Sequence, residues 1–397
     1  PGKKNYVDFG PVNTVVSSNF IDKVRFRASA QTTANLSPHL FLKGYAAYGV
    51  RDKKWKYEGE VEYSFLKKQY SPEEFPRNSI AISTRYDVMA PSDAMLPTDK
   101  DNVFTSLKTQ TIDQMSYFRQ YNIRYVYEFD NHFGITAQLR HITQNPTGTL
   151  FYRTVGGQMV PELTQSEATL SLRYAPGEKV VVTKQRRHPV NHNYPIYTLM
   201  HTTGFKDVLG GDYASNYTEL SVTKRFWLNS YGRIDIYGRA GAQWNRVPFP
   251  LLITPAANNS YIIQRSMFNM INNMEFMNDR FVSLAVQWDL SGKLFNRIPL
   301  LKHLKWREVI GFKTLYGTLT DKNNPFKKGN QSDLFEFPSR NGQPTSFVMG
   351  DTPYMELNVG IHNIFKILRV DYVRRLNYLN APNAKKNGVR FVLQFDF

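Results

Sequence analysis

The sequence predicts an all-β fold, a transmembrane antiparallel up-and-down β-barrel of about 16 strands. Three observations lead to this prediction. Apolar and polar residues alternate at the period of a β-strand in many segments, aromatic residues make up 14% of the 397-residue chain, and the last segment is amphipathic. The mean hydropathy is −0.45, and no run approaches the roughly 20 apolar residues of a membrane-spanning helix. A barrel is compatible with low hydropathy because each strand faces lipid on one side only.

The segment from 54 to 65 shows the alternation. One face carries Trp55, Tyr57, Val61, Tyr63 and Phe65, and the other carries Lys56, Glu58, Glu60, Glu62 and Ser64. Successive side chains of a strand point to opposite faces, so one side is apolar and the other polar. The same pattern recurs in segments 122–130, 133–140, 233–244 and 368–372. Such segments, about 9 to 13 residues long, cross a membrane when tilted.

The connections between these segments come in two sizes. Short turns occur near 51–53, 131–132 and 229–231, and long polar connections cover 89–118, 145–164, 176–194, 245–266 and 319–352. Outer-membrane barrels place short turns on the periplasmic side and long loops outside. We therefore expect residues 20–397 to form the barrel. Residues 1–19 are expected to be a first strand or a linker from a missing upstream periplasmic region, since the chain begins at Pro1 without Met.

Charge is distributed one residue at a time. Lys and Arg number 50 against 33 Asp and Glu, a net charge of +17. A basic balance raises nucleic acid as a partner, but the even spread favours a basic lumen or a rim facing lipid phosphates. The candidate lumen-lining residues are Glu58, Glu60, Glu62, Arg124, Arg140, Arg173 and Arg239. The arginines are expected to give the lumen a positive potential, with the glutamates in a ladder opposite basic side chains.

Known catalytic and metal-binding patterns are missing from the sequence. There is no Cys, and no phosphate loop, dinucleotide fingerprint or nucleophile elbow occurs. His188 and His192 lack a third ligand, and loop histidines of this kind are usually plain surface residues. The glutamates at 58, 60 and 62 could be read as a glycosidase acid pair, but a lumen ladder explains them more simply. We expect neither enzymatic activity nor a cofactor or metal.

The last segment is amphipathic and ends in an aromatic residue. Its apolar face carries Val389, Phe391, Leu393, Phe395 and Phe397. This pattern matches the assembly signal of outer-membrane barrels, and the alternative is an edge strand of a soluble sheet. The pattern predicts the outer membrane of a Gram-negative bacterium as the location. The expected partners are outer-membrane lipid, lipopolysaccharide, the outer-membrane assembly machinery and a periplasmic domain or other envelope protein, with no nucleic acid.

Several longer stretches resemble a known family. They are G-P-V-N-T at 10–14, Y-A-A-Y-G-V-R-D-K-K-W-K-Y at 45–57, E-F-M-N-D-R-F-V-S-L at 275–284, L-F-N-R-I-P-L-L-K-H-L-K-W-R-E-V at 294–309 and G-I-H-N-I-F-K-I-L-R-V-D-Y at 360–372. The chain resembles a poorly characterised group of outer-membrane barrels that usually follow a carboxypeptidase-regulatory-like domain. This group is distantly similar to the superfamily of outer-membrane assembly factors and two-partner-secretion transporters.

The resemblance implies that a late loop folds into the barrel. In the superfamily this loop has a Val-Arg-Gly-Tyr-like tip, and the corresponding loop here falls within 245–270. Arg265 would match the tip arginine, although Ser266 rather than Gly follows it. Arg265 is therefore a candidate lumen or plug contact, with an ordinary loop arginine as the alternative.

Three functions remain open on the sequence. The resemblance favours transport or assembly of protein or lipid at the outer membrane. A passive pore with a basic lumen that prefers anions is the second reading, and a structural or adhesive surface barrel is the third.

Overall fold

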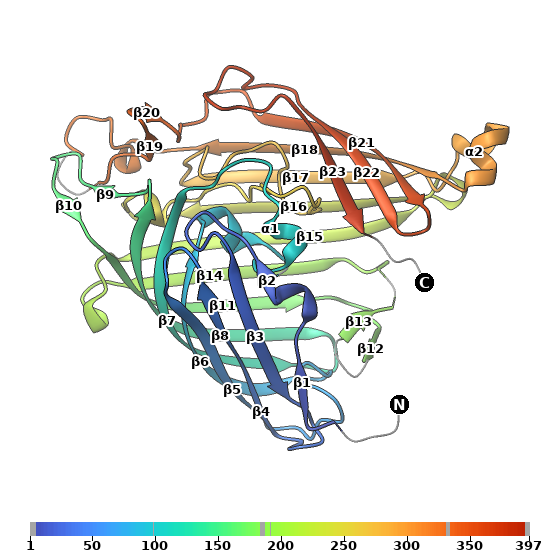
Figure 1. The fold of residues 1–397 in the computed structure, drawn as a ribbon, viewed down its shortest axis with the longest axis horizontal. Coiled ribbons are helices and arrows are strands. Elements are labelled where there is room, and N and C mark those ends of the chain that lie inside the picture. Colours follow the sequence, from blue (N-terminus) through green and yellow to red (C-terminus); the bar gives the residue numbers. More distant parts are fainter. Residues whose placement is uncertain (1–4, 98, 183–186, 191, 331–333, 394–397) are drawn as a thin grey trace.

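The computed structural model describes residues 5–97, 99–182, 187–190, 192–330 and 334–393. One antiparallel sheet of 17 strands dominates it (Figure 1). Its strands are β1 (Val7–Phe9), β2 (Val16–Ser17), β3 (Arg25–Thr32), β4 (Leu40–Gly49), β5 (Trp55–Ser64), β6 (Asn78–Met89), β7 (Gln114–Glu128), β8 (Phe133–Gly148), β11 (Leu163–Tyr174), β14 (Ile196–Phe205), β15 (Ser215–Trp227), β16 (Arg233–Gln243), β17 (Arg280–Asp289), β18 (Arg307–Thr318), β21 (Tyr354–Ile364), β22 (Leu368–Arg375) and β23 (Asn387–Leu393).

Each long strand pairs with the next one along the chain, which is up-and-down order. β1 and β2 both pair with β3, at opposite ends of it. They therefore act as two pieces of one interrupted edge strand, and the sheet has sixteen positions. The predicted strand number and topology are confirmed. Residues 1–19 contribute this edge strand over the part that the structure describes.

The smaller elements lie in the connections. They are the hairpins β9 (Tyr152–Arg153) with β10 (Met159–Val160), β12 (Val180–Val182) with β13 (Arg187–Pro189) and β19 (Ser339–Arg340) with β20 (Gln343–Pro344), the helices α1 (Val103–Ser106) and α2 (Pro299–Leu304), and the short 3-10 turns Val12–Thr14, Pro91–Met95, Val208–Gly210, Asn229–Tyr231, Phe249–Leu251, Phe295–Arg297 and Asp321–Asn323. Among the described residues, none of the helices has the length and apolar character to span a membrane.

The two faces of the sheet differ as the alternation predicts. On β5, Trp55, Tyr57, Val61 and Tyr63 are exposed, whereas Lys56 and Glu62 are buried. The last strand shows the same division, with Arg390 buried between exposed Val389 and Phe391. An apolar outer face rich in Tyr and Trp is what a lipid-facing barrel requires.

The sequence predicted short turns at one end of the sheet and long connections at the other. This prediction is wrong at two places. The short turn at 50–54 lies at the same end as the long connections 90–113, 244–279 and 319–353, while the long connection 175–195 lies at the other end. Up-and-down order explains this, because every second connection returns to the same end whatever its length. The first and last strands leave the sheet at the end that carries 175–195 and α2 (Figure 1).

Closure by strand pairing was also expected, because an open edge leaves backbone groups unpaired in lipid. Over the described part of the chain, β23 pairs with β22 and not with β1 or β2, so hydrogen-bonded closure is not detected. We call the gap between these edge strands the seam.

The core lies inside the curve of the sheet. Residues of the 244–279 connection fill it in two apolar clusters. The first joins Ile253, Ala257, Phe268, Met270, Ile271 and Phe276 to Phe281, Leu315, Met349, Tyr354 and Val373. The second joins Val247, Phe249, Leu252, Met274 and Met277 to Leu150, Tyr152, Leu163, Phe335 and Phe337. The interior is therefore packed with side chains from the long connections.

Candidate functional site: the inward loop, the seam and the interior pocket

The connection 244–279, here called the inward loop, covers the free edge of β23. The backbone N–H of Ile263 donates to the carbonyl of Phe391 at 2.8 Å, and the N–H of Phe391 donates to the carbonyl of Tyr261 at 2.8 Å. These two bonds form a short parallel bridge. The unpaired backbone N–H and C=O groups of an edge strand can otherwise hydrogen-bond to another strand. The loop therefore occupies the position that β1 or β2 would have in a closed barrel.

A second connection, 90–113, continues the bridge across the seam. The N–H of Thr109 donates to the carbonyl of Asn259 at 2.8 Å, and the N–H of Tyr261 donates to the carbonyl of Leu107 at 3.0 Å. On its other side, helix α1 of this connection packs against β2. The seam is thus spanned by two loop segments in series rather than by a strand ladder.

Buried charges fix the 90–113 connection to the first strands. Asp101 lies 3.1 Å from Arg25 and 2.9 Å from Arg27, and Asp87 accepts from Arg25 at 2.6 Å. Arg25 and Asp87 are fully buried. Buried ions of this kind need several partners to offset their desolvation, and this cluster supplies them from β3, β6 and the connection together.

The inward loop is held to the last strands by a separate set of polar contacts. Glu356 on β21 accepts the backbone N–H groups of Asn269 at 2.9 Å and Met270 at 3.0 Å. Arg375 on β22 makes two bonds to the Glu275 carboxylate, at 2.6 and 3.1 Å. Two charge-assisted bonds in parallel fix orientation as well as distance. These contacts fix the inward loop in the interior of the barrel.

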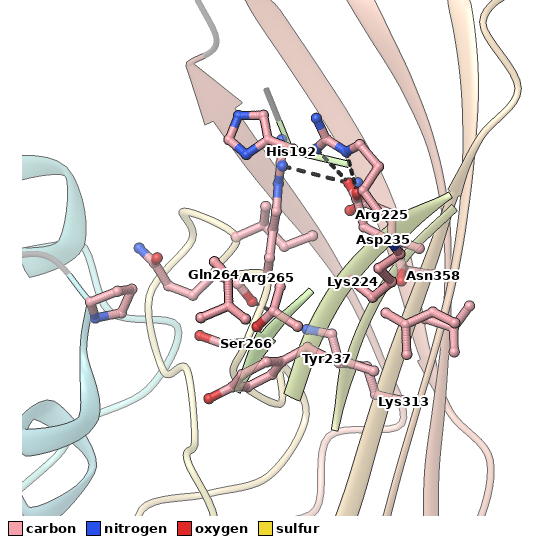
Figure 2. Close-up of a pocket in the computed structure, with 18 of the residues that line it drawn as sticks. His192, Lys224, Arg225, Asp235, Tyr237, Gln264, Arg265, Ser266, Lys313 and Asn358 are labelled. Carbon is pink, nitrogen blue, oxygen red and sulfur yellow. Dashed lines mark hydrogen bonds and ion pairs between the residues drawn. The ribbon is translucent and has the colours of Figure 1, made fainter. Parts of the chain in front are cut away.

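Beyond the tip of the inward loop lies a pocket of about 650 Å³ (Figure 2). Its side chains come from the loop tip, from strands β14 to β18 and β21, and from the connections 90–113 and 175–195. They include His192, Tyr194, Arg225, Asp235, Tyr237, Gln264, Arg265, Ser266, Lys313 and Asn358. Arg225 donates to Asp235, with its second nitrogen at 2.9 Å, and Arg265 approaches the same carboxylate at 3.9 Å.

The pocket is basic. Burial and the neighbouring guanidinium of Arg225 lower the pKa of His192, which keeps that imidazole neutral near pH 7. The remaining charged side chains at the wall are cations except for Asp235. Among the described residues, no cluster of three or more His, Cys, Asp or Glu is arranged to hold a metal ion.

Comparison with known proteins adds the family. Residues 2–326 match the C-terminal domain of a family of unknown function, DUF5686. The chain belongs to this family. No curated protein matches the sequence.

Solved structures add the fold. BamA from Haemophilus ducreyi lacking POTRA domains 1–3 is similar with a TM-score of 0.57 at 9% identity, over 98% of this chain and 71% of that one. CdiB from Acinetobacter baumannii has a TM-score of 0.46 at 10% identity, over 95% of this chain and 57% of that one. OccK11 (OpdR) from Pseudomonas aeruginosa has a TM-score of 0.34 at 9% identity, over 97% of this chain and 91% of that one. The resemblance to an uncharacterised family inferred from the sequence is confirmed, and the similarity to BamA shows that the fold is shared.

In this DUF5686 barrel the predicted lumen glutamates lie on the inner face and meet arginines. Glu58 lies 3.6 Å from Arg85, Glu60 lies 3.1 Å from Arg124, and Glu62 lies 2.7 Å from Arg77. Each of the three glutamates therefore forms an ion pair with an arginine from another strand or turn. The spacing of the glutamates along β5 is explained by this pairing.

The other predicted lumen arginines are paired too. Arg140 donates to Glu167 at 2.9 Å, Arg173 to Glu178 at 2.8 Å and Arg239 to Glu219 at 2.7 Å. The expected positive lumen is thus wrong for these positions. Each of these arginines has a carboxylate partner, which offsets the cost of its partial burial.

The candidate assembly signal and Arg265 are placed as follows. Val389, Phe391 and Leu393 are exposed on the outer face of β23 at 44%, 37% and 41%. Phe395 and Phe397 lie outside the described residues. Arg265 reaches the interior pocket from the tip of the inward loop (Figure 2).

Sequence reasoning missed the groups that hold the plug and form the pocket. Glu275, Glu356 and Arg375 carry no local signal, because their partners are distant in sequence. Arg225 and Asp235 do carry one. They face each other across the hairpin whose turn lies at 228–232, so an arginine and an aspartate equally far from a predicted turn would have identified the pair.

Proposed function

We propose that this barrel takes part in moving or inserting protein or lipid at the outer membrane of a Gram-negative bacterium, and that it is not an enzyme. The observation that carries the proposal is the seam. The first and last described strands are not hydrogen-bonded to each other, and the inward loop covers the edge of β23 through two backbone bonds to Phe391. Exposed strand edges are sites where another chain can add as a strand.

The energetics of the seam support this role. A full ladder between two membrane strands would have a bond at nearly every residue, as between β22 and β23, where seven residue pairs are in register. The bridge from β23 to the inward loop has two bonds. At about 1 kcal/mol net for each hydrogen bond, this backbone bridge contributes less than a strand pair does, although Arg390 of β23 adds a bond to the carbonyl of Asn269 at 2.6 Å and bonds facing lipid cost more to break.

The fold is in accord with the proposal. The chain has the architecture of BamA over nearly its whole length, and the superfamily resemblance points to assembly or secretion. The partners that follow from this role are outer-membrane lipid, lipopolysaccharide, the assembly machinery during biogenesis and a periplasmic domain or other envelope protein. A passive anion pore is less well supported, because the inward arginines are paired and side chains pack the interior.

Removal of the protein from its native host tests the role. We expect quantitative proteomics and lipid analysis of the outer-membrane fraction to show a selective loss of one or more components, restored by the wild-type chain. An unchanged outer membrane together with reduced uptake of small anions would contradict the proposal and favour the pore.

A further inference from the structure

We propose that the interior pocket beyond the tip of the inward loop binds an oxyanion of the phosphate class, with Arg265 as its main contact. The pocket adjoins the seam at Ile263, and the proposal does not depend on what the barrel transports.

Among the described residues, Arg265 has no carboxylate that it does not share with another arginine. Over the described residues its guanidinium has no hydrogen-bond partner, and its nearest carboxylate, that of Asp235, lies 3.9 Å away. Both oxygens of Asp235 already accept from Arg225. The Arg265 side chain lines the pocket and is 51% exposed. Guanidinium groups held inside a protein normally pair with an anion, often through two bonds.

The surroundings leave a surplus of positive charge. The described residues that line the pocket include four cations, Lys224, Arg225, Arg265 and Lys313, and one carboxylate, Asp235. Lys313 lies 3.8 Å from a second carboxylate, that of Glu356, outside the lining. The nearby arginines outside the lining have carboxylates of their own, since Arg369 pairs with Asp371 at 2.6 Å and Arg233 lies 3.3 Å from Asp289. An anion entering the pocket would meet Arg265 and Lys224, the two lining cations that have no carboxylate of their own among the described residues.

The other donors favour a phosphate group over a carboxylate. Beside the guanidinium of Arg265 the wall carries His192 and Arg225, and farther along it carries the hydroxyls of Tyr237 and Ser266 and the amide of Gln264 (Figure 2). A phosphate offers three or more acceptor oxygens and up to two negative charges, which matches several donors and more than one cation. A carboxylate offers two oxygens.

The size of the pocket leaves room for more than the anion. At about 650 Å³ it is far larger than a phosphate group, and Tyr194, Ile196 and Ile263 add apolar wall. Ligand pockets typically combine apolar lining with a few placed polar groups. A free phosphate ester and the headgroup of a phospholipid share the chemistry that this site recognises.

Binding to the full chain in detergent tests the site. Calorimetric titration with inorganic phosphate and with glycerol phosphate at constant ionic strength forms one arm. Thermal unfolding in nanodiscs that contain phosphatidic acid or only phosphatidylcholine forms the other. We expect Arg265→Gln to raise the dissociation constant of the phosphate compound that binds by at least about tenfold, since a hydrogen bond to a charged group is lost. Arg265→Lys, which keeps the charge but not the fork, should fall between.

Arg297 provides the matched control. It is an exposed arginine in the connection 290–306, which lies at the same end of the sheet as the connection 175–195. Arg297 does not line the pocket. Arg297→Gln should bind like the wild type. A response to the soluble phosphates identifies a free ester as the source, and a response only to phosphatidic acid identifies a lipid headgroup; either supports the proposal if Arg265→Gln removes it. No response in either arm, or equal binding by Arg265→Gln and the wild type, overturns it.

Discussion

Buried ion pairs hold the inward loop more firmly than surface pairs could. Arg375 and Glu275 have side-chain exposures of 0% and 1%, and two bonds join them. Lys327 and Asp321, in the 319–353 connection, also form a pair at 3.3 Å, but their side chains are 54% and 79% exposed. Water screens the second pair and not the first. Removing the basic side chain should therefore cost much more stability at the buried pair than at the exposed pair.

Replacing Arg375 by Leu should lower the free energy of unfolding by about 3 kcal/mol, because Glu275 is left buried without a partner. Lys327→Ala should change it by less than about 0.5 kcal/mol. The measurement is urea unfolding of the vesicle-inserted chain, followed by heat-modifiable gel mobility. The double variant Arg375→Leu/Glu275→Leu should recover much of the loss. Equal losses from Arg375→Leu and Lys327→Ala would show that the buried pair does not anchor the loop.

Alternation along strands made the faces of individual residues predictable, whereas the loop contacts were not. Glu60 and Arg124 could be assigned to the inner face because the strand period is two. Their pairing at 3.1 Å depends on the register of β5, β6 and β7, which the pattern alone does not give. Residues of the inward loop follow no period, so the environment of Arg265 and the partner of Glu275 could not be foreseen.

At the scale of elements, the last strand has two different edges. Toward β22 it has a regular ladder, and toward the seam it has the inward loop at Phe391. The amphipathic pattern of 389–397 predicted the strand and its outer face. It could not predict what covers the free edge, because backbone groups are the same in every sequence. Closure was expected from the cost of unpaired backbone in lipid, and a loop meets that need in place of a strand.

A cysteine pair tests this edge directly, and the absence of other cysteines makes the result unambiguous. Ile262 and Phe391 are bridge partners, so their Cα atoms lie about 5 Å apart, within the range that a disulfide needs. Ile262→Cys/Phe391→Cys should cross-link under mild oxidation, seen as a mobility shift of the denatured chain that reductant reverses. Ile262→Cys/Val389→Cys, two residues away on the same face, should not. Cross-linking of the control pair alone would place the loop elsewhere.

For the whole molecule, the main alternative to a transport or assembly role is an open pore, and the interior decides between them. About 16 strands enclose a lumen wide enough for water. The inward loop fills much of it with the two apolar clusters and is tied to the last strands through Glu356 and Arg375. The inner-face arginines predicted to attract anions are neutralised by carboxylates. This packing and pairing favour a plugged barrel over an open pore.

Single-channel recording of the intact chain in planar bilayers should therefore show almost no steady conductance. A variant that lacks residues 248–264 loses Phe249, Leu252, Ile253 and Ala257 from the two clusters and also the bridge to Phe391, so it should open stable conducting events. Heat-modifiable mobility of the variant controls for folding, because a folded barrel migrates differently before and after boiling. Pore radius and wall charge set the size and selectivity of the current, and paired arginines predict weak anion preference in the opened variant. Stable anion-selective conductance from the intact chain would instead require an open lumen, and the plugged architecture would then not describe the protein in a membrane.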